Sequence, residues 1–414
     1  MYVNGRSIRP SDGGLCQLEV RGQSGQNQGS APNVEFPRRA VQGVRVIDRV
    51  QFDTPMNPKL PSSAGIKEIA KALGTSIGTV DRALHARSGV SPKTRDRVLK
   101  MAEKLNYRPN VAARNLKLNH RLRIGVFLPE QIASFFDRVR DGIRAAADAG
   151  GGIGIDLVFH SYPRLGEGDS AAIEKADWQQ FDGIIMAPGN PAGLGSISRK
   201  LEAEAKPVIF VATDAPRMTH LASIAVDATV SGGIAADLLG HVITSPASVA
   251  TITGDLRIQD HAEKLRGFAA SLATLSPHLS LLPAIESHES PDDAYRAAMD
   301  LIKRHPDLGG LYINTANSLP VLRAMEESGH LAGLKVITTD LFPELVPLIE
   351  DGRVLASLYQ RPFSQGKAAF EMLIRFLSSQ VAPKPITRLA PHIVLRSNLS
   401  LFVEMIERDD SSSF

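Results

Sequence analysis

The chain has 414 residues, of which 43% are hydrophobic, 5% aromatic and 22% charged, a composition that excludes a wholly disordered protein. No stretch approaches the about 20 consecutive apolar residues of a membrane helix. Cys16 is the only cysteine, which excludes a disulfide scaffold and a cysteine-rich zinc site. Residues 1–14 lack the apolar core of a secretory signal, so we expect a cytoplasmic protein without membrane contact.

The formal net charge of +3 conceals an uneven distribution along the chain. Residues 65–120 hold twelve Lys or Arg against four acidic residues, whereas the part after residue 120 is acidic overall. This imbalance favours a polyanion-binding head followed by a body that binds something else. A solvated run of charges is the alternative interpretation.

Residues 1–63 differ from the rest of the chain, because segments rich in Gly, Ser, Gln and Pro interrupt any periodicity. We expect a disordered extension with one short strand near residues 44–50. Met56 lies just before the first periodic segment and is a candidate start of translation.

Residues 64–109 predict three short helices. Apolar residues of the first share one face, and Gly74 ends it. Ser76 offers a cap for the second helix, and Ser91 followed by Pro92 begins the third. This order is that of a helix-turn-helix domain, whose second helix enters the major groove of DNA. A small three-helix bundle without DNA contact fits the same pattern.

After residue 121 the pattern changes to short apolar runs that alternate with amphipathic stretches. This rhythm predicts parallel, doubly wound sheets with covering helices, and about 290 residues of it favour two α/β lobes. The predicted strands are residues 123–129, 155–162, 183–188, 207–213, 223–227, 248–255, 309–314 and 334–340.

The motifs of common enzymes are missing from the sequence. It contains no GxxxxGK[ST], no GxGxxG after a strand, no HExxH and no GxSxG, and its eleven histidines lack metal-ligand spacing. We therefore expect no enzyme, no cofactor and no metal site.

Five sequence elements identify the head more closely: IKEIAKALGTS, TVDRAL, VSPKTRDRV, LNYRPN and AARNL. With them, residues 65–117 resemble the DNA-binding head of the lactose-repressor/galactose-repressor (LacI/GalR) family nearly end to end. The resemblance implies a helix-turn-helix domain over 64–109, a hinge helix or linker over 110–120, and double-stranded operator DNA as partner.

The resemblance implies two kinds of DNA contact in the helix-turn-helix domain. Hydroxyls and helix N-termini at Ser76, Thr79, Ser91 and Thr94 are expected near phosphates, where they fix the register without reading the sequence.

Base contacts are expected from the second helix. Arg82 projects from it and is suited to a bidentate contact with guanine. Ile77 and Gly78 occupy the early base-reading positions, where they offer little hydrogen bonding, and Asp81 departs from the serine usual in the family. In the hinge, Asn110, Ala113 and Leu116 are expected at the minor groove, with Leu116 as an apolar wedge between base pairs.

The body, residues 121–403, is similar to the sugar-binding fold that this family shares with periplasmic binding proteins such as ribose-binding protein. The similarity implies two lobes joined by three crossovers, with a ligand in the cleft between them. We expect lobe 1 over about 121–227 and 360–387, lobe 2 over about 228–359 and 388–403, and a tail over 404–414.

Aromatic residues are expected against the sugar ring, and polar residues at strand ends against its hydroxyls. Lys264 stands where the family often has an arginine that grips the sugar, and Arg266 is its alternative. The residues expected at the ligand are Phe135, Phe136, Asp137, Asp214, Lys264, Arg266, Asn314, Asp340 and Gln360.

The sequence thus predicts a DNA-binding transcriptional regulator, in particular a repressor, controlled by a sugar-like ligand. Because one head covers one half-site, we expect a homodimer on a pseudo-palindromic operator. Two alternatives stay open: a solute-binding protein for a sugar transporter, and an α/β enzyme that acts on a carbohydrate.

Overall fold

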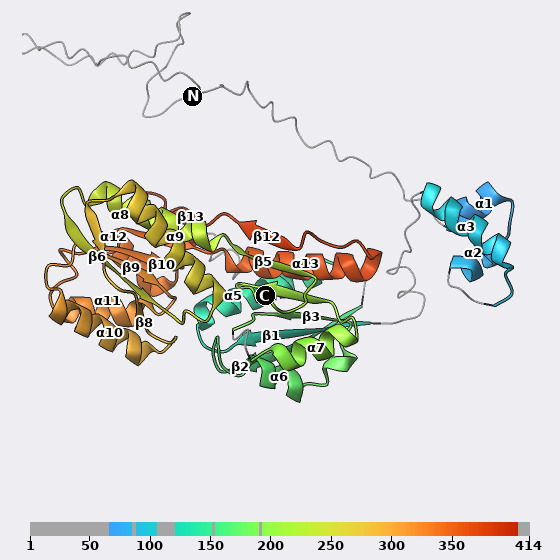
Figure 1. Ribbon diagram of the computed structural model, residues 1–414, viewed down its shortest axis with the longest axis horizontal. Coiled ribbons are helices and arrows are strands. Elements are labelled where there is room, and N and C mark those ends of the chain that lie inside the picture. The colour runs from blue at the N-terminus through green and yellow to red at the C-terminus, as the bar shows by residue number, and fades with distance from the viewer. Residues whose placement is uncertain (1–65, 85–87, 106–120, 151–153, 190–192, 405–414) are drawn as a thin grey trace, which may run out of the picture. The chain divides into compact units, whose positions relative to one another are not determined.

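The computed structural model describes residues 66–84, 88–105, 121–150, 154–189 and 193–404. The predicted extension over 1–63, Met56 and the hinge positions Asn110, Ala113 and Leu116 lie outside these residues. The described residues form a small head of three helices and a body of two sheet-containing lobes (Figure 1).

The head consists of α1 (Ile66–Leu73), α2 (Ile77–Leu84) and α3 (Pro92–Lys104). The predicted turn between α1 and α2 contains Gly74 with φ +64°, a backbone conformation that glycine adopts without strain. Apolar residues of all three helices meet in one core, which confirms the predicted three-helix order. The buried core residues are Ile69, Ala70, Val80, Ala83, Val98 and Ala102.

Lobe 1 contains a parallel sheet of six strands in the order β12-β5-β4-β3-β1-β2. Helices α5 and α13 pack on one face of this sheet, and α6 and α7 on the other. The strands are β1 (Leu122–Pro129), β2 (Ile155–Tyr162), β3 (Gly183–Met186), β4 (Val208–Val211), β5 (Ala222–Val226) and β12 (Ile386–Leu389). The helices are α5 (Ala133–Ala149), α6 (Asp169–Lys175), α7 (Gly195–Ala203) and α13 (Pro362–Ser379), with a 3-10 turn η1 (Trp178–Gln180).

Lobe 2 contains a sheet of seven strands in the order β13-β11-β10-β9-β6-β7, with β8 also paired to β6. Helices α8 and α9 cover one face, and α10 and α11 the other. The strands are β6 (Ala247–Thr253), β7 (Leu279–Leu281), β8 (Ile285–Glu286), β9 (Gly310–Asn314), β10 (Lys335–Thr339), β11 (Ala356–Tyr359) and β13 (His392–Val394). The helices are α8 (Ala228–Val242), α9 (Gln259–Leu275), α10 (Pro291–Arg304), α11 (Ser318–Glu327) and α12 (Val346–Glu350), with a 3-10 turn η2 (Pro343–Leu345).

The chain passes between the lobes three times: after β5, after β11 and after β12. The structure adds two details to the expected architecture. Lobe 1 extends slightly beyond residue 387, because β12 stays paired with β5 as far as Leu389, opposite Val226. The sheets are not wholly parallel, because β13 runs antiparallel to β11. A short edge strand of this kind carries too weak a periodic signal to be found in the sequence.

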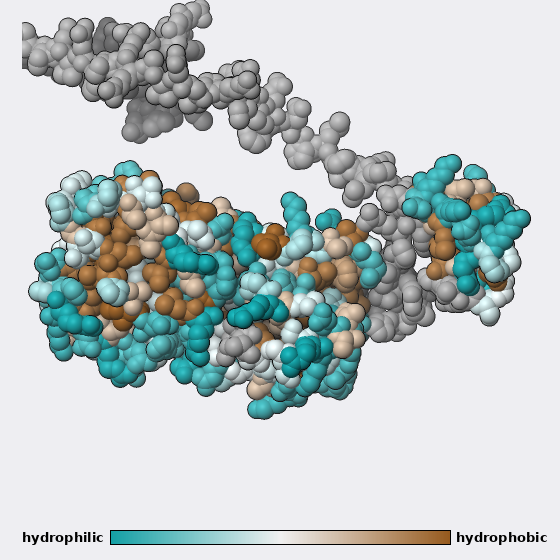
Figure 2. Space-filling view, in the orientation of Figure 1, coloured by the Kyte–Doolittle hydropathy of each residue, from teal (hydrophilic) through white to brown (hydrophobic). Residues whose placement is uncertain are grey.

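The strands are apolar because helices cover both faces of each sheet. All four residues of β4 and all five residues of β5 are buried. Figure 2 shows hydrophobic residues gathered over the region of α8 and α9 on the visible face, where Val230, Val242 and Leu275 are exposed. Among the described residues, no helix combines the length and the apolar character needed to cross a membrane.

In each lobe, two helices pack very closely because one of them has a glycine, which lacks a side chain, at the point of contact. In lobe 1, a Cβ atom at Gly142 of α5 would overlap the carbonyl oxygen of Phe363 on α13. In lobe 2, a Cβ atom at Gly232 of α8 would overlap the carbonyl oxygen of Lys264 on α9. The helices that these glycines position carry side chains of the cleft described below.

We predict that Gly142→Ala destabilises lobe 1 by about 1–3 kcal/mol, because α5 and α13 must separate to admit the methyl group. The loss outweighs the up to about 1 kcal/mol by which alanine favours a helix. Calorimetry of the full chain should show a lower unfolding temperature. Gly333→Ala is the matched control, since no atom lies within 4 Å of its added Cβ. Equal unfolding temperatures for the two variants would contradict the prediction.

Candidate functional site: a cleft between the lobes and the face of the head

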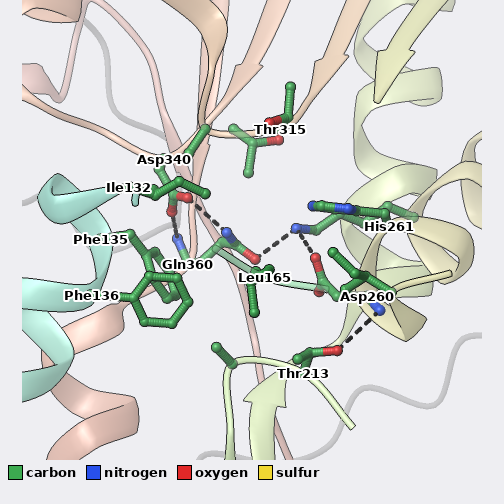
Figure 3. A pocket seen from close by; sticks show the side chains of 15 residues that line it. Ile132, Phe135, Phe136, Leu165, Thr213, Asp260, His261, Thr315, Asp340 and Gln360 are labelled. Carbon is green, nitrogen blue, oxygen red and sulfur yellow. Dashed lines mark hydrogen bonds and ion pairs between the residues drawn. The ribbon is translucent and has the colours of Figure 1, made fainter. Parts of the chain in front are cut away.

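A narrow cleft lies between the two lobes, at the carboxyl ends of their strands. Open sheets of this type bind ligands at this edge. Residues just after β4, β9, β10 and β11 line it, together with the first turns of α5 and α9. The volume of the cleft, including its open mouth, is about 430 Å³. The lining residues, shown in Figure 3, are Ile132, Phe135, Phe136, Leu165, Ala212, Thr213, Ile258, Asp260, His261, Lys264, Thr315, Ala316, Thr339, Asp340 and Gln360.

A row of charged and polar side chains, joined by hydrogen bonds, lies along this cleft. The ammonium group of Lys264 donates to Oδ2 of Asp260 at 2.6 Å and to Oε1 of Gln360 at 2.7 Å. Nε2 of Gln360 donates in turn to Oδ2 of Asp340 at 2.8 Å. Because Lys264 is only 2% exposed, these partners replace the water that its ammonium group loses on burial. Three residues expected at the ligand, Lys264, Gln360 and Asp340, therefore lie together.

The carboxyl group of Asp340 has an unusual environment. Burial and the nearby carboxylate of Asp260 raise its pKa to about 6, although Lys264 and Gln360 favour the charged form. Its backbone has φ +68°, a left-handed conformation that costs energy in a residue with a side chain. Such strain is typical of functional sites.

The opposite wall of the cleft is aromatic. Phe135 and Phe136, at the start of α5, lie edge to face with ring centroids 4.9 Å apart. Both rings line the cleft, as the resemblance implied. An apolar face beside polar groups suits a molecule that has C–H groups as well as hydroxyls.

The lining of the cleft does not include four of the predicted ligand residues: Asp137, Asp214, Arg266 and Asn314. The side chain of Asp137 is 62% exposed and pairs with Arg140 on the same helix. Arg266 is 68% exposed and faces Glu263. One helical turn is 3.6 residues, so Lys264 and Arg266 point in different directions from α9, and of the two only Lys264 lines the cleft.

Asp214 lies beside the cleft rather than in its lining. Its carboxylate accepts hydrogen bonds from Ser223 at 2.9 Å and from Arg388 of β12 at 3.2 Å. These contacts give it a structural role. Asn314 is fully buried behind the lining, where Nδ2 donates to the hydroxyl of Thr253 and to the carbonyl oxygen of His261.

Several lining residues were not predicted from the sequence. Thr315 follows directly after β9, and Thr213 lies one residue beyond that position after β4, so the strand-end rule applied to every strand would have found both threonines. Asp260 and His261 lie in the first turn of α9, and only the packing of α9 shows that this turn faces the cleft.

The head places the predicted DNA-contacting residues on two helix N-termini and one exposed helix. Oγ of Ser76 accepts from the N–H of Thr79 at 3.1 Å, and Oγ of Ser91 accepts from the N–H of Thr94 at 3.2 Å. These caps leave the other N–H groups of the first turns available to an anion.

The second helix of the head, α2, presents the residues expected to meet bases. Ile77 is 49% exposed at its start, next to the exposed Gly78. Arg82 is exposed further along the helix. Its side chain passes near Gly89, where an added Cβ atom would lie 3.9 Å from Cδ of Arg82.

Comparison with known proteins agrees with this architecture. Residues 65–110 match the family of bacterial regulatory proteins named after lacI, and residues 124–380 match the periplasmic binding protein domain. The chain is 22% identical over 338 residues to catabolite control protein A of Priestia megaterium, covering 80% of this chain and 98% of that protein. It is 23% identical over 357 residues to the HTH-type transcriptional repressor PurR of Vibrio campbellii, covering 81% and 98%.

Solved structures share the fold of the body. The glucose-galactose binding protein GanP of Geobacillus stearothermophilus superposes with a TM-score of 0.62 at 22% identity, over 67% of this chain and 99% of that one. A solute binding protein of Burkholderia graminis in complex with D-arabinose gives 0.62 at 21% identity, over 67% and 96%.

A helix-turn-helix head joined to a periplasmic-binding-protein body defines a DNA-binding regulator that responds to a small ligand. The chain combines a head of the lacI family of bacterial regulatory proteins, over residues 65–110, with a body that belongs to the periplasmic binding protein domain family, over residues 124–380. One of the two quoted relatives is named as a transcriptional repressor.

Asp340→Asn should change the pH dependence of stability. The folded-state pKa of about 6 exceeds the usual value for aspartate, so the folded state holds the proton more tightly and this group destabilises the protein as pH rises from about 4 to 6. Relative to the unaltered protein, the variant should gain about 1–3 kcal/mol between pH 4.5 and pH 7.5.

Thermal unfolding at both pH values measures this gain. Asp300→Asn, an exposed carboxyl on α10 next to Lys303, is the control and should show no pH-dependent difference. A constant difference between the Asp340 variant and the unaltered protein at both pH values would refute the assigned environment of this carboxyl group.

Proposed function

We propose that the protein is a transcriptional repressor whose affinity for its operator is controlled by a sugar-like ligand in the cleft. One observation carries this proposal: a lacI-type head and a cleft with a buried polar chain occur in one polypeptide. The head favours this function over that of a transporter's solute-binding protein, which shares only the fold of the body. DNA as the partner supports a cytoplasmic location.

The proposed operator contacts follow from the two N-caps and α2. Ser76, Thr79, Ser91 and Thr94 hold the head on phosphates, Arg82 reads a guanine, and Ile77 and Gly78 lie against bases. Asn110, Ala113 and Leu116, outside the described residues, are proposed to act in the minor groove. One head spans one half-site, which supports a homodimer on a pseudo-palindromic operator.

The ligand is proposed to be a sugar or a sugar derivative. Support comes from the pairing of Phe135 and Phe136 with the polar groups of Lys264, Asp340 and Gln360 across the cleft. The structural neighbours named above include proteins that bind glucose, galactose and D-arabinose. Asp137, Asp214 and Arg266 are not part of the proposal, because their side chains contact other residues.

Ligand control requires the lobes to communicate, and hydrogen bonds provide a route. Nε2 of Gln365 donates to the carbonyl oxygen of Gln360 at 2.7 Å, and Oε1 of Gln365 accepts from the N–H of Ala212 at 3.1 Å. This fully buried glutamine joins the crossover after β11 to the end of β4 in lobe 1. A ligand that contacts Gln360 therefore acts on both lobes, and its preference for one lobe arrangement shifts the equilibrium between arrangements.

Arg82→Ala should reduce discrimination between the operator and random DNA by about 1–3 kcal/mol, because a bidentate contact to guanine carries sequence information. The operator is first selected from random DNA with the full chain, and binding is then measured by fluorescence anisotropy at fixed salt. Lys104→Ala, an exposed cation in the last turn of α3, is the control and should leave discrimination unchanged. Failure of the unaltered chain to select any sequence would overturn the proposed function.

A further inference from the structure

The charges that line the cleft do not balance. Asp260 and Asp340 contribute two carboxylates, and Lys264 is the only Lys or Arg among the lining residues. His261 adds no net positive charge, because Nε2 lies 3.2 Å from Oε1 of Glu289, a carboxylate with no exposed surface. The cleft therefore carries an excess of negative charge in a buried place, where charges interact strongly.

The hydrogen-bond donors of the cleft are mostly engaged already. Gln360 uses one of its two amide hydrogens on Asp340, and the hydroxyl groups of Thr315 and Thr339 donate to Glu289 and to the carbonyl oxygen of Ile313. Behind the lining, Asn314 donates both amide hydrogens. A ligand would meet few donors here, chiefly the remaining proton of Lys264, the second amide hydrogen of Gln360 and the hydroxyl of Thr213.

The orientations of the side-chain amides of Asn314 and Gln360 follow from their hydrogen-bond partners. Nδ2 of Asn314 faces the carbonyl oxygen of His261, which only accepts. Oε1 of Gln360 faces the ammonium group of Lys264, which only donates. Reversing either amide would place like groups against each other.

Acceptors, in contrast, remain free. Among the described residues, Oδ1 of Asp260 and Oδ1 of Asn314 are buried and have no hydrogen-bond partner. Asp260 is 9% exposed and lines the cleft. An unsatisfied buried carboxylate oxygen costs free energy, which a donor or a cation at that position would recover.

We propose that the cleft recognises a polyhydroxylated molecule with an ammonium group, an amino sugar, whose ammonium lies against Asp260 and Asp340. This inference rests on the proposed function and narrows its ligand class. The hydroxyls donate to carboxylate oxygens of the lining, and the ring packs on Phe135 and Phe136. A sugar acid or a sugar phosphate would place its anion beside two carboxylates with no arginine to receive it.

The test compares matched molecules on the unaltered full chain by isothermal titration calorimetry. The panel contains glucosamine, galactosamine and mannosamine, the three parent hexoses, and glucuronate and galacturonate. At least one amino sugar should bind at least tenfold more tightly than its parent hexose, and neither acid should bind. A parent hexose or an acid that binds as tightly as the best amino sugar, or no binding by any amino sugar, overturns the proposal.

Asp260→Asn tests the residue itself. The variant should lose the preference for the amino sugar over its parent, to less than threefold, while Asp300→Asn should retain it. If the Asp260 variant does not fold, the titrations of the unaltered chain with the panel still test whether the cleft prefers an amino sugar. Retention of the full preference in a folded Asp260 variant overturns the assignment. Operator selection by the same preparation tests the proposed function separately, so a failure of the ligand class and a failure of DNA binding are distinguishable.

Discussion

The arrangement of the cleft depends on the hydrogen bonds that the buried ammonium group of Lys264 makes. A charge removed from water is tolerated only with close partners, and here these are Asp260 on the same helix and Gln360 on the crossover. Because Gln360 also holds Asp340, the single cation fixes the positions of α9, the end of β10 and the end of β11 relative to one another. The backbone of Lys264 also packs closely on α8, where a Cβ atom at Gly232 would overlap its carbonyl oxygen.

Strain in the backbone is concentrated around the same place. Ile132, Ala212, Asp340 and Arg361 have positive φ angles although none is a glycine, and the first three line the cleft. The surrounding sheets and helices must hold these residues in place, because the conformation is unfavourable by itself. We interpret the strain as the consequence of turning side chains into the cleft immediately after a strand.

Sequence patterns were sufficient for the architecture and insufficient for the details of the site. All eight predicted strands and the three helices of the head exist, since apolar runs and N-caps such as Ser91 are local signals. The direction of a side chain from α9 is not local, so Arg266 and Lys264 were indistinguishable until the packing was known. Asp214 was misplaced for a similar reason, because its partner Arg388 is 174 residues away in the sequence.

We propose that the cleft and the head influence one another, and linkage gives the most direct measurement of this coupling. The dissociation constant of a cleft ligand, identified by its binding to the full chain, is measured with and without saturating operator. The account predicts that operator changes the affinity for the ligand by the same factor by which the ligand changes the affinity for operator. Equal ligand affinities in the two titrations would contradict it.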